Sequence, residues 1–116
     1  MANKKKSQTG TPALVIPLFR WRIFQSLDGT RFVMAAAGDG ASRGPIAFES
    51  LDLLTMRLPP QQGVSYHLVG EPGYDDQAQY ALETGWSVDR SAVDVTVQVC
   101  REVGVPERVF ARYKAR

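Results

Sequence analysis

The side chains that could do covalent or metal chemistry in this sequence are few and far apart. Its one cysteine, Cys100, and its one histidine, His67, lie 33 residues apart, with no local motif around either of them. A thiol nucleophile needs a base within hydrogen-bond reach, and a zinc site needs several cysteine or histidine ligands. We therefore predict a protein that is not an enzyme and that uses no metal or cofactor.

The single cysteine also bears on the cellular compartment. One cysteine cannot form a disulfide within the chain, and we expect Cys100 to behave as a small buried apolar residue. Secreted domains of this size often depend on disulfides. No run of residues approaches the roughly 20 apolar residues of a membrane span. The sequence thus predicts a cytoplasmic protein with no membrane partner.

The glycine-rich segment Gly38–Gly44 is typical of a flexible loop rather than of a phosphate-binding loop. Arg43 takes the place of the third glycine of a dinucleotide fingerprint, and the Gly-Lys-Ser/Thr of a P-loop is missing. Arg43, at the tip of the predicted loop, is positioned to contact an anion. The neighbouring carboxylates Asp75 and Asp76 have a simpler use, because acidic residues stabilise the start of a helix.

Basic residues gather at the two ends of the chain. Residues 1–46 carry a net charge of +5, residues 47–100 a net charge of −6, and residues 101–116 a net charge of +3. Lysine and arginine ridges contact phosphates, and exposed aromatic rings stack on bases. The residues predicted to contact nucleic acid or another partner are Lys4, Lys5, Lys6, Arg20, Trp21, Arg22, Arg43, Arg108, Arg112 and Arg116.

The N-terminal half predicts an arm followed by two hairpins. Residues 1–12 form a disordered basic arm, and residues 13–116 form a single domain. Leu18–Gln25 alternates, with Phe19, Trp21 and Ile23 on one face and Arg20 and Arg22 on the other. The turn signal Asp28-Gly29 then joins it to a return strand over Arg31–Ala37. We further predict a short edge strand over Pro45–Glu49, and a second hairpin formed by Leu51–Leu58 and Val64–Val69.

The C-terminal half predicts helices around one ambiguous segment. Asp75–Thr84 has helical spacing and a helix-ending Gly85. Alternating valines in Ser91–Val103 favour a strand, although Ser91 and Gly104 would frame a helix equally well. Pro106–Arg116 predicts a terminal helix. The expected fold is α+β: a small, mostly antiparallel sheet of about four to six strands, with one or two helices packed on one face.

One stretch of the sequence resembles a known group of proteins. The run Tyr66–Asp75, followed by Ala78, Tyr80 and Trp86, is similar to a segment in uncharacterised small proteins of bacterial mobile elements. The resemblance covers residues 53–86. It implies a bacterial plasmid, phage or integrative-element setting. It implies no site residue, because that group has no assigned activity.

Three functions are consistent with these features. The first is a small non-enzymatic binding or accessory protein that engages nucleic acid or a nucleoprotein through its basic termini. The second is a protein-directed inhibitor or adaptor of a mobile element, anti-CRISPR-like or directed at a host protein. The third is a homo-oligomeric structural protein that associates through an exposed strand edge.

Overall fold

The computed structural model describes residues 14–38, 42–75, 79 and 91–115, and it confirms the predicted α+β fold. The predicted arm and nearly all of the predicted helix Asp75–Thr84 lie outside the described residues. In the described part no helix is long and apolar enough to cross a membrane. The elements are β1 (Leu14–Gln25), β2 (Arg31–Ala37), β3 (Ser42–Phe48), β4 (Val64–Leu68), β5 (Val93–Asp94), α3 (Thr96–Val103) and α4 (Glu107–Phe110).

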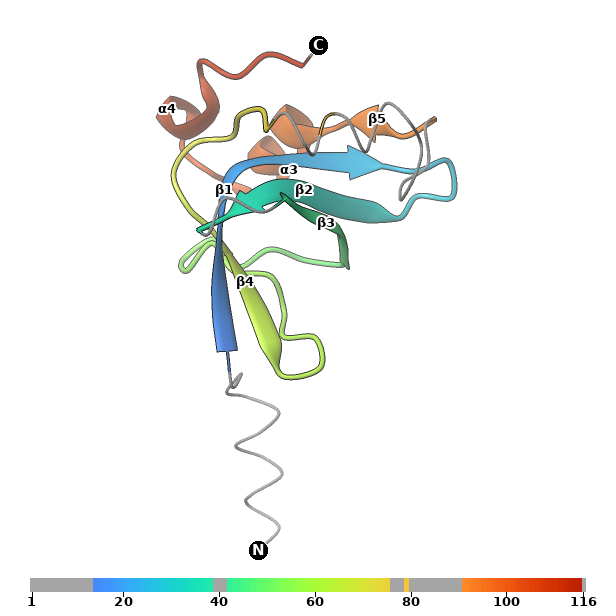
Figure 1. Ribbon diagram of the computed structural model, residues 1–116. Coiled ribbons are helices and arrows are strands. Elements are labelled where there is room, and N and C mark those ends of the chain that lie inside the picture. The colour runs from blue at the N-terminus through green and yellow to red at the C-terminus, as the bar shows by residue number, and fades with distance from the viewer. Residues whose placement is uncertain (1–13, 39–41, 76–78, 80–90, 116) are drawn as a thin grey trace, which may run out of the picture.

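Strand β1 organises the sheet, and Figure 1 shows it bending midway. Its first half, Leu14–Leu18, pairs in parallel with β4. Its second half pairs in antiparallel with β2, and its last two residues also pair with β5. Strand β3 pairs with β2, so the main order is β3-β2-β1-β4. The sheet is therefore mostly antiparallel with one parallel pair.

The first predicted hairpin and the predicted edge strand are both confirmed. Thr30 N donates a hydrogen bond of 2.9 Å to Asp28 Oδ1 in the β1–β2 turn, where Gly29 has a φ of 91°. Strand β3 is longer than predicted, because it begins at Ser42. Arg43 therefore lies opposite Ala35 within the sheet, and its predicted position at a loop tip is wrong.

A bulge at Arg20 changes which side chains of β1 face the core. Arg20 has a φ of 49°, and the register with β2 shifts between Phe19 and Arg22. The extra residue reverses the alternation at this point. Leu18, Trp21 and Ile23 consequently share the main core cluster, whereas the sequence had placed Phe19 on that face.

The second predicted hairpin is wrong, because Leu51–Leu58 is not a strand. Asp52 Oδ1 accepts a hydrogen bond from Leu54 N, and Asp52 Oδ2 accepts one from Thr55 Oγ1, which closes a turn. Only the end of this segment runs beside β4, where Leu58 N donates to Tyr66 O and Leu68 N donates to Met56 O.

The predicted strand over Ser91–Val103 is also wrong, because most of it is helix α3. Asp94 Oδ1 accepts hydrogen bonds from both N and Oγ1 of Thr96 at the helix start, at 2.9 and 2.7 Å. Thr96 Oγ1 in turn accepts a 2.9 Å hydrogen bond from Ile23 N of β1. Gly104 ends the helix with a φ of 98°, the left-handed conformation that glycine adopts most easily.

The predicted terminal helix Pro106–Arg116 is much shorter in the structure. Helix α4 ends at Phe110, after which Tyr113 turns back to the sheet. Its hydroxyl donates a hydrogen bond to Asp94 Oδ2, and its ring stacks on Tyr74 at a centroid distance of 5.5 Å. Burial, followed by this hydrogen bond, raises the pKa of Tyr113. The chain leaves the helix to make these contacts.

The main core lies between the sheet and the two described helices. Trp21 from β1 and Val33 from β2 share one cluster with Cys100 from α3 and Phe110 from α4. Both helices therefore pack on the same face of the sheet, as the sequence predicted. A smaller cluster centred on Phe24, Phe32 and Met34 is separate from this core.

Candidate functional site

The residues predicted to bind on β1 have three different environments. Arg20 is exposed, and its Nη2 lies 3.3 Å from Asp75 Oδ1. Trp21 is fully buried, and its Nε1 donates a 3.3 Å hydrogen bond to Gly70 O. Arg22 is only 2% exposed. The predicted basic face of this strand is therefore wrong, and Trp21 is not available to stack on a base.

Arg22 packs against two aromatic rings. Its guanidinium carbon lies 4.7 Å from the ring centroid of Tyr74 and 5.3 Å from that of Phe24. Nη1 donates a 2.6 Å hydrogen bond to Gln79 Oε1, whereas Nε and Nη2 have no hydrogen-bond partner in the described part of the chain. Aromatic faces attract cations, so this arginine serves the interior of the fold.

The C-terminal arginines do not form the predicted ridge. Arg108 is exposed on α4, but Arg112 lies beyond the end of the helix, with its Nη2 2.8 Å from Glu71 Oε2. Lys4, Lys5, Lys6, Arg116 and the side chain of Arg43 lie outside the described residues. Among the described members of the predicted set, the structure brings together no continuous basic surface.

Carboxylates also pair with Arg31, which is half-buried, and with the exposed Arg101. Both terminal nitrogens of Arg31 donate to Glu102 of α3, at 2.8 and 3.3 Å. This hydrogen bond is the main reason that the pKa of Glu102 lies below its usual range. Arg101 lies 3.3 Å from Glu107. Much of the basic charge in the described sequence is therefore matched locally.

Cys100 and His67 occupy separate places in the fold. Cys100 is fully buried in the core, as the sequence predicted, and burial raises the pKa of its thiol to about 11. The thiol is therefore almost entirely protonated at neutral pH and is a poor nucleophile. His67 is half-buried and lines a surface groove. The described residues include no group of three metal-ligating side chains.

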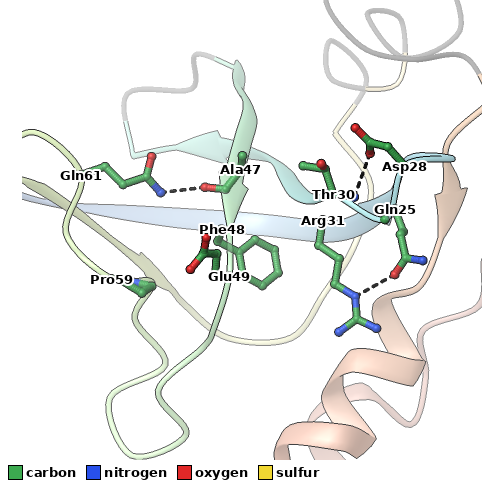
Figure 2. A pocket seen from close by; sticks show the side chains of 10 residues that line it. Gln25, Asp28, Thr30, Arg31, Ala47, Phe48, Glu49, Pro59 and Gln61 are labelled. Carbon is green, nitrogen blue, oxygen red and sulfur yellow. Dashed lines mark hydrogen bonds between the residues drawn. The ribbon is translucent and has the colours of Figure 1, made fainter.

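One surface cleft of about 820 Å³ lies between the β1–β2 turn, the end of β3 and the loop before β4, and its lining is both polar and apolar. Figure 2 shows its side chains engaged with one another. Arg31 Nε donates to Gln25 Oε1 at 2.8 Å, and Gln61 Nε2 donates to Ala47 O at 2.7 Å. Polar groups that already bond to one another gain little free energy by binding a ligand instead.

A second hollow, which we term the leucine groove, has a more apolar character. It has a volume of about 540 Å³ and lies between the turn at residues 53–56, the end of β4 and the connection from α3 to α4. Such a volume is typical of ligand sites. Its apolar lining consists of Leu53, Met56, Leu68, Val69, Val105, Pro106 and Val109, and its polar rim consists of His67, Glu71 and Arg108.

The turn beside the groove presents two leucines to solvent. Leu53 is 39% exposed and Leu54 is 91% exposed. Asp52 fixes the turn, because it accepts hydrogen bonds from Leu54 N at 3.1 Å and from Thr55 Oγ1 at 2.8 Å. Met56 N also donates to Asp52 O at 2.7 Å. The exposed leucines therefore stand on an ordered turn.

Comparisons with known proteins found no match for this chain: no protein-family model, no curated protein and no solved structure. Any inference about function therefore rests on the geometry described above. The resemblance of residues 53–86 to proteins of mobile elements thus stays a prediction.

Sequence reasoning missed the leucine groove, although one signal was present. Leu53 and Leu54 are adjacent, so they cannot both face the core of a regular strand. Asp52 and Thr55 flank them at a spacing that suits a side-chain-capped turn. The prediction of a strand over Leu51–Leu58 obscured that signal.

Proposed function

We propose that the chain is a small non-enzymatic binding protein that engages a protein partner through the leucine groove and the adjacent turn. The observation that carries this proposal is Leu54, which is 91% exposed on the same turn as Leu53 and Met56, two residues that line the groove. Apolar side chains that protrude from ordered backbone beside a groove are suited to serve as the centre of a protein interface.

The order of the turn adds to this argument. An exposed leucine taken alone is common on protein surfaces and needs no explanation. Leu54 differs because the side chain and backbone of Asp52 hold its backbone in place. A preorganised contact loses less conformational entropy on binding than a flexible one. An inhibitor or adaptor of a mobile element would use such a surface.

Nucleic-acid binding through the basic termini is the second candidate. Arg57, Arg108 and Lys114 are exposed and have no ion pair with any residue that the structure describes. Together with Lys4, Lys5 and Lys6 of the predicted arm, they favour some contact with phosphates. The burial of Trp21 and Arg22 argues against nucleic-acid binding through β1, where the sequence predicted exposed basic and aromatic side chains.

Photocrosslinking in bacterial cells tests the first proposal. A benzophenone amino acid in place of Leu54 is expected to give discrete protein adducts, because this side chain would lie inside the interface. The matched control is the same substitution at Leu27, which is 85% exposed in the β1–β2 turn. Identical adducts from both positions, or adducts only from position 27, would contradict a partner surface at the groove.

A further inference from the structure

We propose that the leucine groove binds a short peptide segment that carries an aliphatic anchor next to an aspartate or glutamate. This inference rests on the proposed function, and it adds the chemical class of the partner. The aliphatic lining of the groove accounts for the anchor, and the charge on its rim accounts for the acidic residue.

Arg108 gives the rim a positive charge that no described residue neutralises. Arg108 lines the groove, is exposed, and has no ion pair with a described residue. Among the described residues that line the groove, only Glu71 carries a carboxylate, and it is already paired with Arg112 at 2.8 Å. An acidic side chain that enters the groove would therefore meet Arg108 without displacing an existing ion pair. Complementary charge of this kind orients a partner and speeds its association.

A second cation lies close to the same rim. Arg57 and His67 are opposite each other in an antiparallel bridge, so their side chains emerge on the same face of β4. His67 lines the groove, and Arg57 is exposed with no described ion pair. Arg57 is not among the residues that line the groove, so it adds positive charge beside His67 and not to the rim itself.

The lining favours a peptide over a nucleic acid. Nucleic-acid strands bind where aromatic rings stack on bases beside a basic track. The described residues that line the groove include leucine, valine, methionine and proline, but no phenylalanine, tyrosine or tryptophan. Aliphatic lining suits a leucine-like or valine-like anchor, and the rim then selects the charge beside it.

Selection from a phage-displayed library of random dodecapeptides against the full-length protein tests this proposal. We expect enriched peptides that combine an aliphatic residue with a nearby aspartate or glutamate. Their binding should be lost in Leu54→Asp and retained in Leu27→Asp. In Arg108→Glu we expect binding about threefold to tenfold weaker, because the variant loses an exposed ion pair and places two like charges together. Replacing the peptide's acidic residue with lysine should restore it.

The control for charge is Lys114→Glu, which changes the net charge equally but lies outside the lining of the groove. Circular dichroism confirms that each variant is folded. Peptides that need Leu54 but show no acidic preference and no response to Arg108→Glu would overturn this inference alone. If a labelled single-stranded oligonucleotide or a second copy of the chain occupies the groove in a Leu54-dependent manner, and no peptide does, both the inference and the proposed function are overturned.

Discussion

Replacing Trp21 with alanine is expected to lower the free energy of unfolding by about 3–5 kcal/mol. Trp21 is fully buried in the main core cluster beside Leu18 and Ile23. Its indole nitrogen donates a 3.3 Å hydrogen bond to Gly70 O, which ties β1 to the segment that follows β4. The substitution leaves a large cavity and an unpaired carbonyl oxygen. Urea denaturation followed by far-ultraviolet circular dichroism measures the loss.

Trp21→Phe serves as the control, because it keeps most of the buried ring and removes the hydrogen bond. We expect its loss of stability to be clearly smaller than that of Trp21→Ala. A binding residue on the surface would behave differently, since exposed substitutions usually change stability by less than about 0.5 kcal/mol. A Trp21→Ala change within that range would contradict the buried position.

Replacing Asp94 with alanine is expected to cost about 2–4 kcal/mol of stability, because several hydrogen bonds are lost together. Asp94 Oδ1 accepts from N and Oγ1 of Thr96 at the start of α3. Its other oxygen accepts from the Tyr113 hydroxyl. This one carboxylate therefore joins β5, α3 and the C-terminal segment. Thermal and urea denaturation both report the change.

A double-mutant cycle with Tyr113→Phe separates the two halves of this contact. If Asp94 and Tyr113 act through their hydrogen bond, the double variant should lose less stability than the sum of the two single variants. The bonds to Thr96 persist in Tyr113→Phe, so that single variant should be milder than Asp94→Ala. Strict additivity would show that the hydrogen bond does not couple the C-terminal segment to α3.

The sheet illustrates what local patterns can and cannot predict. Alternation and the Asp28-Gly29 turn were enough to predict the β1–β2 hairpin. The bulge was not predictable, because its residue with a positive φ is Arg20 and not a glycine, the residue type that usually adopts this conformation. One inserted residue then moved Phe19 off the core face that it was predicted to share with Trp21.

Helix α3 was misassigned for a different physical reason. The alternating valines from Val93 to Val99 favour a strand, whereas Ser91 and Gly104 would frame a helix. Contacts between residues distant in sequence stabilise the helix. Thr96 accepts a hydrogen bond from Ile23 N of β1, and Val99 and Cys100 pack in the core against the sheet. Tertiary packing thus overrode the local preference for a strand.

The candidate site was less predictable than the fold. Residue type alone selected the arginines, yet Arg20 and Arg112 pair with Asp75 and Glu71, which are far away in the sequence. Whether a basic residue is free to bind depends on such pairs. The leucine groove likewise combines three segments that only the folded chain brings together.

Nuclear magnetic resonance titration of the full-length ¹⁵N-labelled protein with a library-selected peptide tests most directly where the chain binds. We expect chemical-shift changes to concentrate at residues 53–56, 67–71 and 105–109, which border the leucine groove. They should disappear in Leu54→Asp and persist in Leu27→Asp. Changes confined to Arg20, Lys114 and residues 1–12, with the groove unaffected, would show that the chain binds elsewhere.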